Sequence, residues 1–171
     1  MWGASEGGCP QRVGDALRWA VKLLVARQVE TPRLDAELLL ADVLGVERPQ
    51  IQVRWKDCLS DGQIRQFTAL VRRRMQHEPV AYLLGERAFF DVDLYVTRDV
   101  LIPRPESEHL VEAALAWAAE RGAWHVADVG TGSGALAIVL ARHLPQALVW
   151  AVDLSFEALS VASRNRERYG L

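Results

Sequence analysis

The sequence predicts two parts, an all-helical first part and a second part in which strands and helices alternate. Three observations support this fold class. Apolar residues recur at helical spacing over residues 1–78. The pattern changes to short strand-like runs over residues 79–102. Beyond residue 103, a strand-length apolar run leads into a glycine-rich loop and a further helical segment. A chain of 171 residues is long enough for one domain of usual size or two small ones.

Composition and charge exclude several classes of protein. Half of the residues are apolar and a quarter are charged, which is the balance of a globular protein. With 20 basic and 22 acidic side chains, the chain has no global attraction for nucleic acid or for an anionic membrane. No apolar stretch is long enough to span a bilayer, and the N-terminus does not resemble a secretory signal. We therefore expect a cytoplasmic protein.

Cysteine and histidine usage predicts no metal site. Cys9 and Cys58 do not form a Cys-x-x-Cys pair, which excludes a disulfide scaffold and a cysteine zinc site. The four histidines are spread along the chain, so a histidine metal cluster is not predicted. His125 is expected in a buried strand. The histidines are His77, His109, His125 and His143.

The first predicted helices have recognisable beginnings and ends. Helical spacing predicts an amphipathic helix over roughly Val13 to Gln28. Thr31 is expected to accept a hydrogen bond from a free amide of the next helix, and Pro32 occupies a position where its missing N–H costs nothing. That helix is expected to stop at Gly45, a residue that tolerates the left-handed exit conformation.

A later helix completes the predicted bundle. Ser60 and Gln63 have the spacing of a capping box, and an apolar stripe follows until Pro79 ends the run. Residues 1–78 therefore read as a small helical bundle. Arg72, Arg73 and Arg74 in this helix are either a solvated face or a docking patch for an acidic or phosphate-bearing partner, and the sequence leaves both interpretations open.

Residues 79–102 are expected to form a β-hairpin linker. Strand-like residues run from Tyr82 to Val100, with a turn at Asp91 to Asp93. Pro103 and Pro105 follow, and helical spacing then predicts a helix to about Glu120, with Gly122 beyond its end.

The glycine-rich stretch is the most informative part of the sequence. A strand over Trp124 to Val129 is followed by a loop, Gly130 to Gly134, and by a helix from Ala135 to His143. A second strand, Ala147 to Val152, ends on Asp153, and a helix runs from about Ser155 to Tyr169. This order is that of the opening unit of a doubly wound nucleotide-binding fold.

Glycines in such a loop allow positive φ angles and let a ligand approach the backbone closely. Asp153 lies 21 residues after Gly132, at the end of the neighbouring strand, where a carboxylate can accept hydrogen bonds from ribose hydroxyls. The alternative is a glycine-rich connector with a helix-capping Asp.

Asp128 distinguishes between two nucleotide ligands. Gly130, Gly132 and Ala135 fit the dinucleotide fingerprint with Ala in its third place. A carboxylate two positions before the first glycine would repel a pyrophosphate, whereas it would attract the sulfonium and ammonium groups of S-adenosylmethionine. The methyl donor is therefore the favoured ligand. An Asp at a strand end can also cap the next turn.

Two motifs make the sequence resemble a known family. Residues 128–135 resemble the first motif of class I methyltransferases, and residues 101–108 look like the signature that precedes it in the HemK (PrmC) family. Three further stretches agree, and the resemblance runs from about Val13 to Leu171, with Ser107 where the family usually has Thr. These stretches are residues 31–40, 79–85 and 89–100. The resemblance implies a helical bundle, a β-hairpin linker and the start of a Rossmann-like class I methyltransferase domain.

The resemblance also implies an activity and a set of site residues. The family methylates the side-chain amide of a glutamine in peptide chain release factors, with S-adenosylmethionine as cofactor. The bundle, residues 1–78, would recognise the substrate, and residues 103–171 would form an incomplete cofactor-binding domain. Asp153 would hold the ribose, with Asp128 nearby, and Pro103, Arg104 and Glu106 would lie beside the pocket or form a rigid linker. The methionine part of the donor would be cradled by Gly130, Thr131, Gly132, Ser133 and Gly134.

One family motif is missing. Members carry an Asn-Pro-Pro-Tyr motif that orients the substrate amide, whereas Asn165 is the only asparagine here and precedes Arg166. We therefore expect no catalytic residue in these 171 residues, weak cofactor binding and little or no activity of this chain alone. The alternatives are a ribosomal-protein glutamine methyltransferase, a non-catalytic module that binds a release factor or the ribosome, and an NAD-dependent oxidoreductase.

Overall fold

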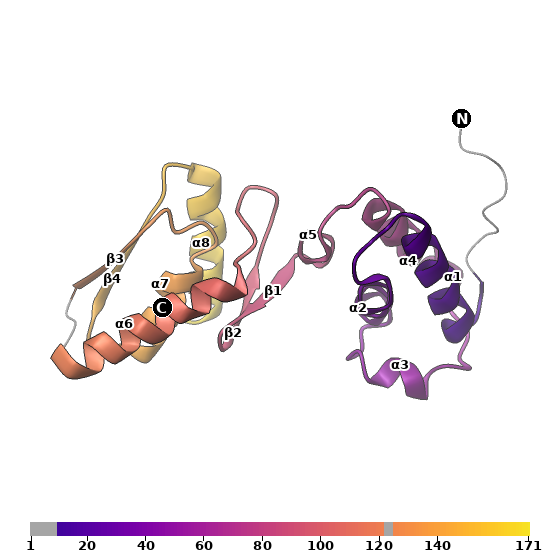
Figure 1. The fold of residues 1–171 in the computed structure, drawn as a ribbon, viewed down its shortest axis with the longest axis horizontal. Helices are drawn as coiled ribbons and strands as arrows, with labels where there is room; N and C mark the ends of the chain where they lie inside the picture. The colour runs from indigo at the N-terminus through magenta and orange to yellow at the C-terminus, as the bar shows by residue number, and fades with distance from the viewer. Residues whose placement is uncertain (1–9, 122–124) are drawn as a thin grey trace. The chain divides into compact units, whose positions relative to one another are not determined.

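The computed structural model describes residues 10–121 and 125–171, in which the predicted fold class is confirmed (Figure 1). Helices come first, followed by a small antiparallel hairpin and a region in which strands and helices alternate. The chain divides into two compact units between Leu84 and Gly85. This division falls inside residues 79–102, which were expected to form a separate linker. No helix among the described residues combines the length and apolar character needed to cross a bilayer.

The first unit is built from helices that surround one apolar core. Its helices are α1 (Val13–Ala26), α2 (Pro32–Leu44), α3 (Gln50–Val53), α4 (Asp61–Arg74) and α5 (Val80–Leu84). Leu24, Leu39 and Phe67 are fully buried in this core. Residues 82–84, expected to be strand-like, are helical because Val80, Leu83 and Leu84 pack on the core at helical spacing.

The ends of the helices can be compared with the caps and stops that the sequence predicts. The capping box is confirmed: Gln63 N donates to Ser60 Oγ (3.3 Å) and Ser60 N donates to Gln63 Oε1 (2.9 Å). Gly45 ends α2 with a φ of +62°, also as predicted. The prediction for Thr31 is wrong, because its hydroxyl donates to Asp35 Oδ1 (2.8 Å) and accepts no hydrogen bond from the backbone amides of α2. The carboxylate one turn away is the stronger acceptor for this hydroxyl.

Two of the three consecutive arginines have partners inside the unit. Arg74 Nε donates to Asp35 Oδ2 (2.7 Å), and both side chains of this ion pair are nearly buried. Arg73 forms a two-pronged contact with Glu78, and these hydrogen bonds raise the pKa of Arg73. Of the three arginines, left open in the sequence as a solvated face or a docking patch, Arg73 and Arg74 are therefore engaged in internal contacts.

The second unit opens with an antiparallel hairpin, β1 (Glu86–Phe89) and β2 (Val92–Tyr95). Pairing runs from Glu86 with Tyr95 to Phe89 with Val92, so the turn is formed by Phe90 and Asp91. The expected turn at Asp91 to Asp93 is wrong, because Val92 is a buried strand residue that packs beside Phe89. Phe90 adopts the required positive φ of 54°.

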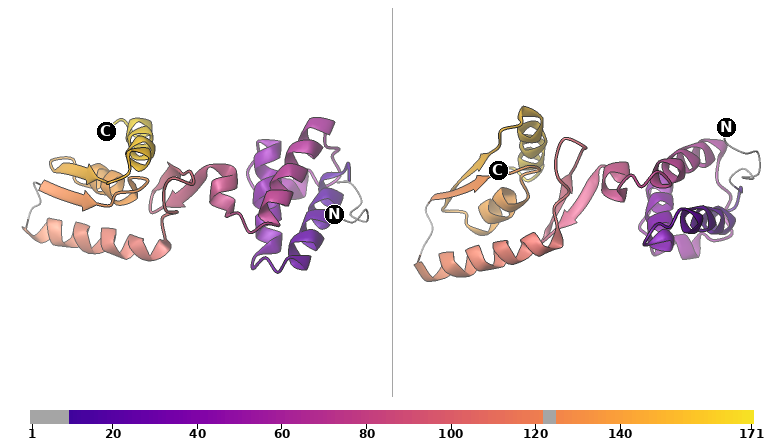
Figure 2. Two further views of the ribbon diagram at one scale, coloured as in Figure 1. Left: turned by 90° about the horizontal axis from the view of Figure 1, so that it is seen from above. Right: turned by 45° about the horizontal axis from the view of Figure 1, so that its top comes forward.

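The rest of the unit follows the predicted alternation (Figure 2). Its elements are η1 (Pro105–Ser107), α6 (Glu108–Arg121), β3 (His125–Val129), α7 (Ala135–His143), β4 (Leu148–Val152) and α8 (Phe156–Arg168). Strands β3 and β4 are parallel neighbours. Expectations for Gly122 and Trp124 lie outside the described residues.

One face of the β3–β4 sheet is open. The parallel register pairs His125, Ala127 and Val129 with Leu148, Trp150 and Val152, so these six side chains share a face. Trp150 is 57% exposed and Val129 is 81% exposed. His125, expected to be buried, is exposed as well, because no described element covers this face. The opposite face lies toward α7 and α8.

Candidate functional site

The predicted glycine loop joins β3 to α7 and has the conformation that its glycines allow. Gly130, Gly132 and Gly134 have φ angles of +79°, +56° and +82°. A Cβ added to Gly134 would lie 3.3 Å from Ala162 Cβ, so the loop rests directly on α8. A Cβ on Gly132 would meet no atom within 4 Å. Glycine is favoured at position 132 by backbone conformation, and the space beside it would admit a ligand.

The loop is anchored to the end of β4 through its backbone amides. Gly130 N and Thr131 N both donate to Val152 O, at 2.7 and 3.0 Å. Gly132 N donates to Asp153 Oδ2 (2.9 Å). The spacing of 21 residues between Gly132 and Asp153 therefore corresponds to a direct hydrogen bond across the sheet end.

Asp153 is a half-buried carboxylate that organises the backbone around it. Its Oδ1 accepts a hydrogen bond from Ser155 N (3.0 Å), while Oδ2 accepts the one from Gly132. The N–H bonds from Ser155 and Gly132 lower the pKa of Asp153, so the group is ionised at neutral pH. Because each carboxylate oxygen has more than one acceptor site, these oxygens can accept further hydrogen bonds, as a ribose would require.

Asp128 caps the first turn of α7. Its Oδ2 accepts hydrogen bonds from Thr131 Oγ1 (2.7 Å) and from Ala137 N (3.3 Å). This contact supplies an acceptor for one of the amides that a helix N-terminus leaves without an internal partner. The capping role that the sequence left open is therefore present. The predicted role of Asp128 toward a methyl donor remains a prediction.

The structure brings together some of the predicted site residues but not all. Asp128, Asp153 and the loop from Gly130 to Gly134 form one cluster, in which Thr131 and Ser133 are buried. The segment from Pro103 to Glu106 runs into η1. Its backbone hydrogen bond, accepted by Arg104 O from Ser107 N, closes a turn of η1 itself. Among the described residues, no hydrogen bond joins that segment to the loop. In the same residues, no three His, Cys, Asp or Glu side chains gather as metal ligands do.

Asn165 is a buried residue of this site that the sequence reasoning missed. It is fully buried, and its Nδ2 donates to Ser133 O in the glycine loop (2.9 Å). The available signal was its position on the apolar stripe of α8, beside Val161 and Ala162. A lone amide on a buried face must find hydrogen-bond partners. From the sequence, Asn165 was tested only against the Asn-Pro-Pro-Tyr motif, which it does not match.

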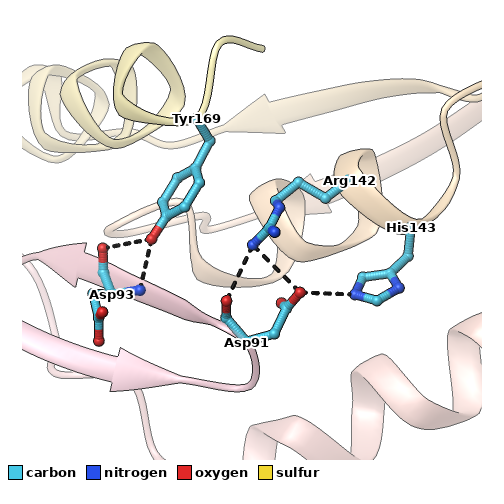
Figure 3. Close-up of polar contacts among 5 residues, drawn as sticks. All are labelled: Asp91, Asp93, Arg142, His143 and Tyr169. Carbon is cyan, nitrogen blue, oxygen red and sulfur yellow. Dashed lines mark hydrogen bonds and ion pairs between the residues drawn. The ribbon is translucent and has the colours of Figure 1, made fainter.

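The hairpin turn is fastened to α7 and α8 (Figure 3). Asp91 accepts hydrogen bonds from Arg142 Nη1 at its backbone oxygen (3.1 Å) and faces the same guanidinium through Oδ2 (3.3 Å). His143 Nε2 lies 3.2 Å from Asp91 Oδ2. The Tyr169 hydroxyl accepts a hydrogen bond from Asp93 N (2.7 Å) and donates one to Asp93 O (3.0 Å). These contacts make the hairpin part of the second unit.

The loop, the two carboxylates and the alternating elements define the start of a methyltransferase-like α/β region. Comparisons with known proteins agree with this description of the second unit. Residues 15–85 match the family model of the PrmC N-terminal domain, and residues 126–171 match that of a methyltransferase domain. The chain is therefore similar to the HemK/PrmC family, whose N-terminal domain its first unit matches.

Three curated relatives illustrate the match, and each carries the name release factor glutamine methyltransferase. The protein from Chlorobaculum tepidum is 40% identical over 164 residues, which are 93% of this chain and 56% of that protein. The protein from Moorella thermoacetica is 42% identical over 156 residues, covering 91% and 55% of the two chains. The protein from Bordetella pertussis is 46% identical over 139 residues, covering 81% and 52%. The chain thus spans about half the length of the curated relatives it matches.

Proposed function

We propose that this chain is part of an S-adenosylmethionine-dependent methyltransferase that modifies a glutamine side-chain amide in a peptide chain release factor. The observation that carries this proposal is the open glycine loop bonded to Asp153, in a chain about 40% identical to release factor glutamine methyltransferases. A release factor is the favoured partner. A glutamine methyltransferase that acts on a ribosomal protein, or one that associates with the ribosome, would be an enzyme of the same class.

The loop and its carboxylates suit a ligand that is positively charged and carries a ribose. Gly130 to Gly134 would hold the methionine part, with the charge of Asp128 at one side of the loop and Asp153 toward the ribose. S-adenosylmethionine, when bound, supplies an activated methyl group. In the proposed reaction the methyl group passes from sulfur to the amide nitrogen, which loses a proton. Pro103, Arg104 and Glu106 are proposed to lie near this ligand.

The remaining assignments concern the two parts of the chain. Residues 1–78 are proposed to recognise the protein substrate and residues 103–171 to bind the cofactor. Residues 79–102, whose hairpin belongs to the second unit, are proposed to link these two parts. A cytoplasmic location would suit a protein that acts on translation factors. No Asn-Pro-Pro-Tyr sequence occurs within the 171 residues, so the group that orients the substrate amide is not among them. Because this catalysis depends on positioning, these residues alone are expected to transfer methyl groups at background rate.

An NMR titration of the 171-residue chain tests the proposal. S-adenosylmethionine is expected to shift the amide signals of Gly130 to Gly134 and of Asp153, and NAD⁺ is expected to leave them unchanged. The variant Asp153→Ala should abolish the shifts, whereas Glu112→Gln, an exposed acid on α6, should not. Shifts with NAD⁺ and none with S-adenosylmethionine would instead identify an NAD-dependent oxidoreductase. A chain that binds a release factor but binds neither S-adenosylmethionine nor NAD⁺ would be identified as a non-catalytic module.

A further inference from the structure

The outer edge of β2 is completed by one side chain of α8 and by the side chain of the residue that follows this helix. Tyr95 donates its backbone N–H to Asn165 Oδ1 (2.7 Å) and accepts a hydrogen bond from Asn165 Nδ2 at its carbonyl (2.8 Å). Tyr169 forms the corresponding pair of contacts with the backbone of Asp93. Asn165 lies in the last turns of α8 and Tyr169 caps its C-terminus four residues later, while Asp93 and Tyr95 lie two residues apart on the strand. Helix α8 thus satisfies the backbone groups that a neighbouring strand would otherwise satisfy.

Only one of these two side chains also reaches the glycine loop. The second hydrogen of Asn165 Nδ2 is donated to Ser133 O (2.9 Å). Both amide hydrogens and the amide oxygen therefore have backbone partners, in a side chain that is fully buried. Tyr169 contacts the hairpin but has no hydrogen bond with the loop. The two residues therefore form a natural matched pair.

A packing contact accompanies this hydrogen bond. Ala162 lies on α8 one turn before Asn165, and its Cβ would be 3.3 Å from a Cβ placed on Gly134. The last two residues of the loop, Ser133 and Gly134, are thus fixed against α8 by one hydrogen bond and one close contact. On the other side of Asn165, the chain leaves β2 at Tyr95 and continues through the buried Val96 toward the Pro103 segment.

We propose that Asn165 is a positioning residue that holds the glycine loop in its ligand-receiving conformation and fixes the hairpin to it. The amide acts through Ser133, whose backbone it holds, and not by touching a reacting atom. The identity of the ligand rests on the proposed function, whereas the effect on the loop does not.

The matched variants are Asn165→Asp and Tyr169→Phe. The first keeps the shape of the side chain but replaces the NH₂ group, which supplies both N–H donors, with a single carboxylate oxygen that faces the carbonyls of Tyr95 and Ser133. The second keeps the ring, which lies 5.0 Å from the Arg142 guanidinium, and removes only the contacts with Asp93. Amide hydrogen exchange is measured by NMR on the ligand-free chain. The loss of a buried hydrogen bond corresponds to about a tenfold change in an opening equilibrium.

Asn165→Asp is expected to speed exchange about tenfold at Tyr95, Gly132 and Gly134. Tyr169→Phe is expected to speed exchange at Asp93 and to leave Gly132 and Gly134 unchanged. In the unmodified chain, the side-chain amide protons of Asn165, the only asparagine, are expected to exchange more slowly than those of exposed glutamines. Because this last measurement uses only the unmodified chain, it tests the proposal even if Asn165→Asp does not fold. Faster exchange at Tyr95 with an unchanged loop, or rapid exchange of the Asn165 side chain, would overturn the proposal.

A ligand titration separates this inference from the proposed function. S-adenosylmethionine is expected to bind Asn165→Asp about tenfold more weakly than the unmodified chain, and to bind Tyr169→Phe equally well. If the unmodified chain does not bind S-adenosylmethionine, the proposed function is contradicted. If the loop nevertheless opens in Asn165→Asp, the positioning role of Asn165 stands. Equal affinity of both variants, with the loop open in one of them, would contradict the role of Asn165 in ligand binding.

Discussion

The two units of this chain differ in how they bury their apolar residues. The helical unit encloses its core, in which Phe67 is fully buried and even the ion pair of Asp35 and Arg74 is nearly withdrawn from solvent. The second unit leaves a whole sheet face open, with Trp150 57% and Val129 81% exposed. A few helices can close a core around themselves, whereas a parallel sheet is buried only when layers cover both of its faces.

The comparison also shows that the second unit relies on specific polar contacts. The glycine loop is held by Asp128, Asp153 and Asn165, and the hairpin is held by contacts through Asp91 and Asp93. Buried polar groups with several partners specify one arrangement because each lost contact leaves a group unsatisfied. Order at the candidate site therefore depends on a small number of side chains, whereas order in the bundle depends on many apolar ones.

The largest expected effect tests the difference between the two units with one aromatic residue from each. Phe67→Ala should destabilise the helical unit by about 4 kcal/mol, because it removes a fully buried ring and leaves a cavity. Trp150→Ala should cost about 1 kcal/mol or less, because the side chain is mostly in water. Residue-resolved hydrogen exchange measures the free energy of each unit separately. Similar costs for the two variants would mean that the sheet face is covered in solution.

A second prediction concerns the buried ion pair of the helical unit. Asp35→Ala should cost about 3 kcal/mol, because it leaves the Arg74 guanidinium nearly buried without its carboxylate. Arg33→Ala breaks the exposed pair with Glu37 on the same helix and should cost about 0.5 kcal/mol. Urea denaturation of both variants gives the comparison. If the two costs are alike, the hydrogen bond from Arg74 Nη1 to Glu78 O (3.2 Å) is a sufficient partner for the guanidinium, and the ion pair adds little to the stability of the bundle.

A third prediction addresses the attachment of the hairpin. Asp91→Ala should cost the hairpin about 1 kcal/mol, because the carboxylate contacts with Arg142 and His143 are partly exposed. Faster exchange of β1 and β2 amides, with the β3 amides unchanged, is the expected readout. Asp99→Ala is the matched control, because Asp99 makes its side-chain contacts with the nearby Thr97. If Asp99→Ala loosens the hairpin equally, the Asp91 carboxylate contacts drawn in Figure 3 do not fix the hairpin.

Local chemistry explains which parts of the fold were predictable from the sequence. The capping box at Ser60, the exit at Gly45 and the bounds of the helix after the loop each depend on residues within one or two turns. The prediction for Thr31 was wrong because its hydroxyl is oriented toward the carboxylate of Asp35, one turn away, to which it donates. The hairpin turn was misplaced because the burial of Val92 is decided by packing within the unit and not by turn propensity.

The candidate site shows the same limit. The glycine loop and Asp153 were found from a motif whose members lie in fixed order along the chain, and the structure joins them by a hydrogen bond. The contacts of Asn165 reach Tyr95 and Ser133, which are 70 and 32 residues away in the sequence. Partners at such separations depend on how β2, the loop and α8 pack, so spacing alone could not identify them. The exposure of His125 likewise depends on which layers cover the sheet.

The smallest expected effect is a pH dependence confined to the second unit. The pKa of Asp153 is lowered by hydrogen bonds from Ser155 N and Gly132 N, relative to its ordinary value of 3.8. A carboxylate with a lowered pKa in the folded state stabilises that state above its ordinary pKa, and this contribution is lost as the pH falls through the lowered value. The amide signals of Gly132 and Ser155 should therefore be constant from pH 7 to about 5 and should shift below about pH 4.

The helical unit supplies the control for this titration. Its capping box at Ser60 uses a hydroxyl and an amide, neither of which titrates, so the Gln63 amide signal should stay constant over the same range. Asp153→Asn should remove the pH dependence at Gly132 and Ser155. Signals that move together at Gln63 and Gly132 would indicate global unfolding of the chain. Signals at Gly132 that still move in Asp153→Asn would mean that Asp153 does not control the pH dependence of the loop.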